Sequence, residues 1–246
     1  GEWTLRDGLK DNSQTITGGA YSPGGLKLQC DENGNPIKQR LGNTVAPLTG
    51  GFGFNGNVGN FDFNLFFNYS LGNVIINGTK LASSFRSGSR TGYNLNSDFA
   101  LGNRYTWIDP ETGLNLASSS SAVLETYGSM TEAGLRLNQL NRNASIFHPA
   151  AVTTMQLIDY AVEDASFLRI NNITVGYTLP KTWVKKAFLQ NVRIYLTGYN
   201  LFCWTNYTGA DPEVDTSSKR NALTPGVDYA AYPKSRSFVG GINITF

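Results

Sequence analysis

The sequence predicts an all-β protein built from long antiparallel strands. Glycine provides 27 of the 246 residues, aromatic residues make up 12% and charged residues only 15%, whereas ordinary domains carry roughly 25% charged residues. Several segments alternate apolar and polar side chains, which is the pattern of strands whose two faces meet different surroundings. The connections between these segments alternate between short and long. These three observations favour strands over helices as the framework of the chain.

The first strong signal is a hairpin, in which two alternating segments flank the turn formed by Gly59 and Asn60. A two-residue loop sets the register of a hairpin. The predicted pairs are Val58 with Phe61, Gly56 with Phe63, Phe54 with Leu65 and Phe52 with Phe67. One face is then almost wholly apolar, whereas the other carries Asn55, Asn57, Asp62, Asn64 and Asn68, with Phe66 as the exception. A soluble sandwich has the same two kinds of face, so the hairpin alone does not distinguish a protein core from lipid.

Further strands are predicted towards the end of the chain. Alternation returns before Pro180, again around Val192, Ile194 and Leu196, and in the last residues. The predicted strands cover about 51–58, 61–72, 166–179, 191–203 and 236–246. Long loops are expected at about 73–165 and 204–235, with short helices around 78–85 and 129–137 and one or two helical turns within 181–190.

The order of the connections indicates a membrane barrel. A two-residue turn, a very long loop, a turn of about ten residues and a loop of about thirty follow one another, and short periplasmic turns alternate with long extracellular loops in outer-membrane barrels. No stretch approaches the roughly 18–20 apolar residues of a membrane helix, and the mean hydropathy is −0.24. We therefore expect strands, and not helices, to span the membrane.

The sequence contains no motif for catalysis or for nucleotide binding. Its one histidine, His148, follows no catalytic pattern, so we expect neither enzymatic activity nor a cofactor. Lys and Arg are scattered and the net charge is +2, which argues against nucleic acid as a partner. Cys30 and Cys203 have no further Cys or His nearby to complete a metal site; they are interpreted as two unrelated thiols, with a disulfide as the open alternative.

Aromatic and acidic residues in or beside the long loops are the candidate contacts with a ligand or partner: Tyr105, Trp107, Trp204, Tyr207, Asp211 and Glu213. Aromatic faces can stack on sugar rings, but Trp204 and Tyr207 also lie just past a strand end, where an interfacial girdle belongs. The girdle is the favoured reading for Trp204, the two readings balance for Trp107, and a turn is favoured for Asp211 and Pro212. The predicted lipid-facing or girdle residues are Phe52, Phe54, Leu65, Phe67 and Tyr177.

Residues 166–180, with the sequence SFLRINNITVGYTLP, resemble the late-barrel signature of SusC/RagA-type TonB-dependent transporters. The segments 197–202, 207–213 and 226–229 and the aromatic-terminated last strand follow in that family's order and spacing. The resemblance also covers 50–80, whereas the long loop between is too variable to compare.

This resemblance implies a 22-stranded barrel in the outer membrane of a Gram-negative bacterium. In that family the barrel contains an N-terminal plug, TonB energises uptake, and a SusD-like lipoprotein helps capture an oligosaccharide or peptide. The last strand, with Phe238, Ile242, Ile244 and Phe246 pointing one way, resembles the signal read by the barrel-assembly machinery. The plug and the remaining strands are not in this sequence, so we expect the C-terminal part of a barrel that the rest of the same barrel completes. The alternative is a soluble or surface-attached carbohydrate-binding β-sandwich, and a passive porin-like channel ranks third.

Overall fold

The computed structural model describes residues 2–3, 15–16, 19–20, 24–27, 32–33, 40–86, 94–151, 158–213 and 226–246. The chain divides into two compact units. One unit comprises 1–40 and 79–161, which we call the loop unit, and the other comprises 41–78 and 162–246, which we call the sheet unit.

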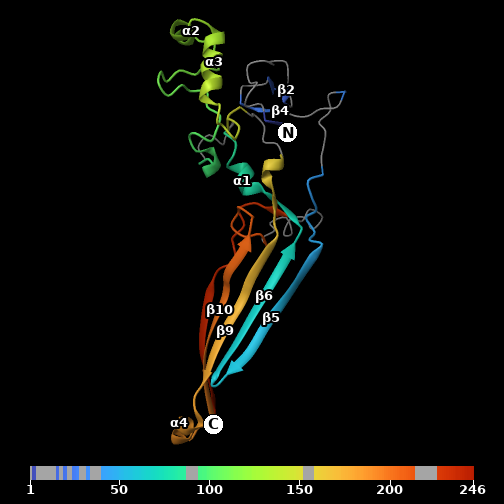
Figure 1. The fold of residues 1–246 in the computed structure, drawn as a ribbon, viewed down its shortest axis with the longest axis vertical. Helices are drawn as coiled ribbons and strands as arrows, with labels where there is room; N and C mark the ends of the chain where they lie inside the picture. Colours follow the sequence, from blue (N-terminus) through green and yellow to red (C-terminus); the bar gives the residue numbers. More distant parts are fainter. Residues whose placement is uncertain are drawn as a thin grey trace. The chain divides into compact units, whose positions relative to one another are not determined.

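The sheet unit is built on a five-stranded antiparallel sheet with the order β12-β10-β9-β6-β5 (Figure 1). Its strands are β5 (Leu48–Val58), β6 (Phe61–Leu71), β9 (Phe167–Thr178), β10 (Asn191–Thr205) and β12 (Ser237–Thr245). These strands occupy the five stretches in which strands were expected, and β5 begins three residues earlier than predicted. The sheet is open within the described part of the chain: β5 and β12 are its edges.

The register of the first hairpin is confirmed. Val58 pairs with Phe61, Gly56 with Phe63, Phe54 with Leu65 and Phe52 with Phe67. Gly59 adopts a positive φ of 61°, a conformation that costs glycine little and that primed two-residue turns require. Two register shifts were not predicted: one lies between Phe66 and Phe67 opposite β9, and the other between Tyr199 and Phe202 on β10.

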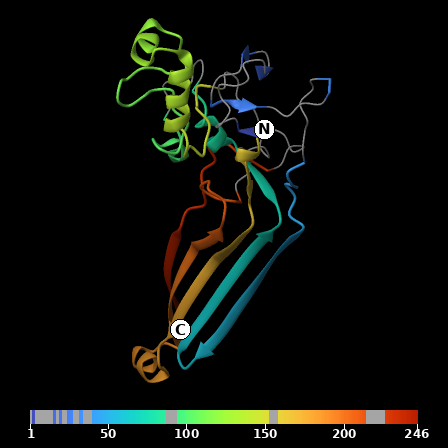
Figure 2. The same ribbon diagram turned by 45° about the horizontal axis from the view of Figure 1, so that its top comes forward.

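One end of the sheet carries all its short connections (Figures 1 and 2). The turn between β5 and β6 lies there, together with the segment between β9 and β10 and the last residues of β12. The expected helical turns within 181–190 are α4 (Lys181–Val184) and η4 (Lys185–Ala187).

A second, three-stranded sheet belongs to the same unit. It consists of β7 (Val74–Asn77), β8 (Val162–Asp164) and β11 (Val227–Asp228), in the order β11-β7-β8. The expectation that 73–165 and 204–235 are loops without strands is therefore wrong at these three places. Such short strands leave no alternation to detect, and each is held by partners far away in the sequence.

The loop unit is mainly helical and irregular. It contains α1 (Gly78–Ala82, which begins at the last residue of the sheet unit), η2 (Ser97–Phe99), α2 (Ser121–Tyr127), α3 (Met130–Leu140) and η3 (Asp159–Ala161). Short strand pairs join β1 (Glu2–Trp3) to β4 (Leu26–Lys27) and β2 (Thr15–Ile16) to β3 (Gly19–Ala20). Helices were expected near α1 and α3, but α2 was not. α3 begins where predicted because the Ser129 side chain accepts a hydrogen bond from the Glu132 backbone N–H at 3.2 Å, as in a capping box.

The loop unit has its own apolar cores. One gathers Phe85, Phe99 and Phe147 with smaller apolar side chains. The other gathers Tyr105, Leu116, Val123 and Leu137, all fully buried. The residues between β7 and β8 thus include an ordered subdomain, and not only an extended loop.

His148 makes this unit sensitive to acid. Its ring stacks on Trp107 with a centroid distance of 3.7 Å, and its Nδ1 accepts a hydrogen bond from the Ala150 backbone N–H at 3.1 Å. Burial, and secondarily the charges of Arg104 and Arg86, lower the pKa of His148 to about 4 from an ordinary 6.5. The native state therefore holds a neutral imidazole.

We expect the stability of the loop unit to fall as the pH drops from 6.5 towards 4, because the unfolded chain then binds a proton that the native state excludes. The expected loss is about 2 kcal/mol, reduced from the full value of the pKa difference because the ring is partly exposed. Hydrogen exchange of peptides from 94–151 should show the loss, and the change should be much smaller in His148→Phe. Identical pH dependence in the two proteins would contradict this role of His148.

Candidate functional site

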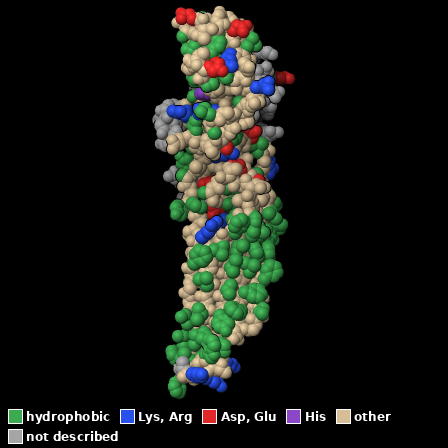
Figure 3. Space-filling model, turned by 60° about the vertical axis from the view of Figure 1, so that its left-hand side comes forward, with side chains coloured by type: hydrophobic (Ala, Val, Ile, Leu, Met, Phe, Trp, Pro, Cys, Tyr) green, Lys and Arg blue, Asp and Glu red, His purple; other side chains and the backbone are tan. Residues whose placement is uncertain are grey.

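One face of the five-stranded sheet is apolar across all its strands. Paired residues on neighbouring strands point to the same side, so the observed registers define this face residue by residue. The apolar face comprises Phe52, Phe54, Val58, Phe61, Phe63, Leu65, Phe67, Ile170, Ile173, Val175, Tyr177, Val192, Ile194, Leu196, Phe202, Trp204, Phe238, Ile242 and Ile244. In the space-filling view these strands present a broad hydrophobic surface (Figure 3).

The apolar face is uncovered in the described part of the chain. Phe54 is 58% exposed, Leu196 57% and Phe238 68%. Contiguous apolar patches of this kind mark interaction surfaces for membranes or for other proteins. A β-sandwich would cover this face with a second sheet, and the described residues provide none there. The open face therefore counts against the soluble alternative.

The height of the apolar face agrees with a membrane barrel. β5 and β6 each contain 11 residues, which corresponds to about 33 Å of strand and, at a tilt of about 40°, to a height of about 25 Å. Aromatic pairs lie towards both ends: Phe61 and Tyr177 have ring centroids 4.7 Å apart, and Phe202 and Trp204 4.6 Å apart. Outer-membrane barrels place aromatic girdles at both edges of an apolar band about 25 Å tall.

The opposite face is polar. It carries Asn55, Asn57, Asp62, Asn64, Asn68, Arg169, Asn172, Thr174, Arg193, Thr197 and Asn243. Thr174 and Thr197 share a hydrogen bond of 2.8 Å. The Arg193 Nε donates a hydrogen bond to Asp62 Oδ1 at 2.8 Å, so an ion pair links β10 to β6 across the intervening β9. Its polar residues alternate with the residues of the apolar face along each strand, as inward-facing and outward-facing residues do in a membrane barrel.

Gly176 leaves room for the ion pair between Arg193 and Asp62. A Cβ at this glycine would lie 2.4 Å from Asp62 Oδ1 and 2.5 Å from Arg193 Nη2. We expect Gly176→Val to displace the flexible ends of both side chains and to break an ion pair that is partly exposed, which costs about 0–1 kcal/mol.

Urea unfolding of the protein in detergent micelles measures the effect of Gly176→Val. Gly240→Val is the control with the same substitution, since a Cβ there meets its nearest atoms only at 3.9 and 4.0 Å. Equal stability of the two variants would show that the ion pair between Arg193 and Asp62, which lies over Gly176, does not stabilise the sheet.

Phe66 is the apolar exception on the polar face of the first hairpin, and its neighbours explain it. A Cβ at Gly51 would lie 2.7 Å from the Phe66 ring, and one at Gly53 3.1 Å from it. The ring thus covers two glycines of β5 and compensates for their missing side chains. Tyr195 covers Gly241 of β12 in the same manner, at 2.5 Å.

A buried ion network ties the connection after β10 to the sheet. Arg169 of β9 is 4% exposed; its Nη2 donates a hydrogen bond to Asp211 Oδ1 at 2.6 Å, and its Nε lies 2.7 Å from Glu213 Oε2. The Lys234 ammonium lies 2.8 Å from the same Glu213 oxygen, and the Lys234 backbone N–H donates a hydrogen bond to Asp211 Oδ2 at 3.0 Å. Both ends of the connection from β10 to β12 are thereby fixed to one arginine.

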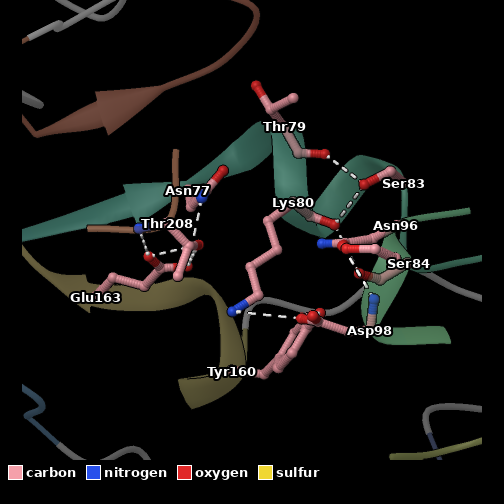
Figure 4. A network of polar contacts seen from close by, with 11 residues as sticks. Asn77, Thr79, Lys80, Ser83, Ser84, Asn96, Asp98, Tyr160, Glu163 and Thr208 are labelled. Carbon is pink, nitrogen blue, oxygen red and sulfur yellow. Dashed lines mark hydrogen bonds and ion pairs between the residues drawn. The ribbon is translucent and has the colours of Figure 1, made fainter. Parts of the chain in front are cut away.

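A second polar cluster holds the three-stranded sheet (Figure 4). Glu163 of β8 accepts hydrogen bonds from the Thr208 backbone N–H and hydroxyl, both at 2.8 Å, and from the Asn77 amide at 3.3 Å. The Tyr207 hydroxyl donates a hydrogen bond to Asp228 Oδ2 at 2.6 Å. Burial and this carboxylate raise the pKa of Tyr207 far above its usual range. The hydroxyl therefore stays protonated and links the connection to β11.

Within the loop unit, Figure 4 shows a separate contact around Lys80 of α1. Its ammonium lies 4.1 Å from the centroid of the Tyr160 ring and 3.9 Å from Asp98 Oδ2. The Tyr160 hydroxyl donates a hydrogen bond to the same Asp98 oxygen at 2.8 Å. This cluster joins α1, η2 and η3 of that unit.

The structure gives the predicted ligand contacts different surroundings. Tyr105 is 0% exposed, Asp211 3% and Tyr207 5%, so these three side chains pack or hold the chain together instead of facing a ligand. Trp107 is partly buried against His148, and Trp204 is exposed on the apolar face. Of the six candidates, Glu213 lines an open hollow.

That hollow lies beside the polar face, near the ends of β5 and β6 that are remote from the hairpin turn. Thr49, Asn68, Phe167, Pro212 and Glu213 line it, among others. The Asn68 amide donates a long hydrogen bond of 3.4 Å to Glu213, whereas its buried Oδ1 has no hydrogen-bond partner among the described residues. Sequence reasoning placed Asn68 on the polar face but did not bring it together with Glu213, because 145 residues separate them.

The predicted lipid-facing side chains divide between exposed and half-buried. Phe52 and Phe54 are exposed, whereas Leu65, Phe67 and Tyr177 are partly covered by their neighbours. Phe238, Ile242, Ile244 and Phe246 are all exposed, and their role as an assembly signal stays a prediction. Cys203 is a free thiol, while Cys30 lies outside the described residues.

No described helix is long and apolar enough to cross a membrane. No group of three or more His, Cys, Asp or Glu side chains that could hold a metal ion occurs in that part of the chain.

No family model matches the sequence. The chain is, however, similar to curated proteins over almost its whole length. It is 28% identical over 242 residues to TonB-dependent receptor P3 of Formosa agariphila, which covers 96% of this chain and 20% of that protein. It is 31% identical over 127 residues to TonB-dependent receptor SusC of Bacteroides thetaiotaomicron, covering 50% of this chain and 12% of SusC. The chain thus spans about a fifth or less of these relatives.

The fold is also shared with solved structures. The RagAB peptide importer in its closed-closed state matches with a TM-score of 0.59 and 22% identity, over 92% of this chain and 21% of that chain. The RagAB peptide transporter matches with a TM-score of 0.60 and 22% identity, over 92% of this chain and 20% of that one. The likeness in sequence supports a relationship to SusC-like TonB-dependent receptors, and the likeness in structure shows that the chain shares its fold with the corresponding part of the RagAB structures.

Proposed function

We propose that the chain forms part of the wall and the outer loops of an outer-membrane transporter that imports glycans or peptides. The apolar face carries this proposal, since an uncovered band of the height of a bilayer core next to a polar face is what a barrel wall requires. The edges β5 and β12 then pair with further strands of the same barrel, which has 22 strands in this family. Phe52, Phe54, Leu65, Phe67 and Tyr177 face lipid or the interface.

We infer the membrane sides from the lengths of the connections. The turn at Gly59 and Asn60 and the segment 181–190 face the periplasm, whereas 73–165 and 204–235 face the exterior. A SusD-like lipoprotein on the outside captures the ligand, and TonB drives uptake through the plug of the transporter. On the polar side, the hollow next to Asn68 and Glu213 is where this chain contacts the oligosaccharide or peptide.

Fractionation of the native host tests this proposal. An antibody against residues 237–246 should detect the protein in outer-membrane fractions, in a complex with a surface lipoprotein. Deleting the gene should abolish growth on the glycan or peptide that the transporter takes up. A soluble species of 26.8 kDa in the periplasm would contradict the proposal and favour the carbohydrate-binding sandwich.

A further inference from the structure

The connection between β9 and β10 has an unusual surface for a short turn. Residues 181–190 contain Lys181, Lys185 and Lys186 and no acidic residue. Trp183 is 62% exposed and Phe188 95% exposed. Phe188 adopts a φ of 58°, a left-handed conformation that is uncommon and strained for a bulky side chain. The segment thus presents two aromatic rings and three cations to its surroundings.

The segment is fixed rigidly to the end of the sheet. The Leu179 backbone N–H donates a hydrogen bond to the Val192 carbonyl at 2.8 Å, and the Gln190 backbone N–H donates one to the Thr245 carbonyl at 2.8 Å. Val184 is only 4% exposed, so the centre of the segment is packed against the protein. Trp183 and Phe188 are therefore exposed on a turn that is anchored at both ends and at its middle.

The apolar face reaches the end of the sheet to which the segment 181–190 is attached. Tyr177, whose ring centroid lies 4.7 Å from that of Phe61, is four residues before the segment, and Ile244 and Phe246 lie at the same end of the sheet. Hydrophobic side chains reach this end of the molecule, where Lys and Arg side chains also gather (Figure 3). If the apolar face lies in the bilayer core, the segment 181–190 is level with the headgroups.

We infer that the segment 181–190 binds the phospholipid headgroup layer at the periplasmic side of the membrane, with Trp183 and Phe188 entering the interface and the three lysines pairing with lipid phosphates. Amphipathic aromatic rings prefer this layer, and lysines beside an anionic surface add electrostatic attraction. The absence of acidic residues within 181–190 fits a negatively charged surface better than a mixed protein surface. This inference rests on the proposed function, because it requires the apolar face to lie in lipid.

Depth-dependent fluorescence quenching tests the inference on the whole transporter. The protein is reconstituted in vesicles of phosphatidylethanolamine and phosphatidylglycerol that contain lipids brominated near the headgroup. The difference between the wild type and Trp183→Phe isolates the signal of Trp183, and the difference between the wild type and Trp204→Phe isolates that of Trp204 on the apolar face. We expect the brominated lipids to quench both signals to a similar extent.

Removing the charges of two lysines tests whether they contribute to the binding of the segment to lipid. The double variant Lys185→Gln with Lys186→Gln should reduce the quenching of Trp183 in vesicles with phosphatidylglycerol, and should change it little in vesicles where neutral phosphatidylcholine replaces that lipid. Quenching of Trp204 without quenching of Trp183 would overturn the inference and leave the proposed function intact. Quenching of neither residue would reject both.

Discussion

Replacing Leu65 with arginine should destabilise the assembled protein by about 2–4 kcal/mol, the cost of a cation near the midplane on the lipid side of a barrel. Leu65 lies near the middle of β6, paired with Phe54 on one side and Ile173 on the other. All three belong to the apolar face, so the guanidinium would have no polar partner there. Urea unfolding in phospholipid vesicles, followed by the shift of the folded band on a gel, measures the effect.

Asn64→Arg is the matched control for this prediction. Asn64 is the preceding residue of the same strand and belongs to the polar face, so the same substitution should cost less than about 1 kcal/mol. A similar loss of stability in both variants would mean that both faces of β6 are buried in protein. That result would contradict the assignment of one apolar and one polar face to β6.

Arg169→Met should cost about 3–5 kcal/mol, because removing one partner of a buried ion pair leaves an uncompensated charge. Asp211 is 3% exposed and would lose its hydrogen bond from the guanidinium, while Glu213 would keep only Lys234 and Asn68. The connection from β10 to β12 should loosen, which limited proteolysis within this connection and thermal unfolding can detect.

Two further variants show whether the network itself is responsible. Lys234→Met should cost about 0–1 kcal/mol, since the lysine side chain is 44% exposed and its ion pair is screened by solvent. Adding Asp211→Asn to Arg169→Met should restore part of the lost stability, and the double-mutant cycle gives the coupling energy. If the effects of the two substitutions simply add, the pairing of Arg169 with Asp211 contributes nothing to stability.

The five-stranded sheet could be predicted from the sequence because its strands and turns have local sequence patterns. The alternation around Phe54 and Leu65, together with a two-residue turn, determined the register of the hairpin in detail, and Pro180 marked the end of β9. The register shift at Phe66 could not be predicted, because a bulge adds one residue without a distinctive composition. The interpretation of Phe66 as an exception was right, but the two glycines that it covers become apparent only when β5 and β6 are paired.

The contacts at the end of the sheet remote from the hairpin turn could not be predicted, because they join residues that are far apart in the sequence. Arg169 and Asp211 are 42 residues apart in sequence, and β11 pairs with β7 across about 150 residues. Asp211 was interpreted as a turn residue and as a candidate ligand contact, whereas the structure makes it the buried partner of an arginine. The fold of the loop unit was also missed, since α2 and the core around Tyr105 arise from packing and not from a periodic pattern.

The most direct test of the barrel wall compares two neighbouring residues of β5 in the native outer membrane. In a protein whose cysteines, Cys30 and Cys203 included, are all replaced by serine, a nitroxide label is attached at Phe54→Cys or at Asn55→Cys. Collision with oxygen, which concentrates in lipid, and with a water-soluble nickel complex is then measured. We predict that the label at 54 collides mainly with oxygen and the label at 55 mainly with nickel. Equal access of the nickel complex to both positions would contradict the assignment of the apolar face to lipid.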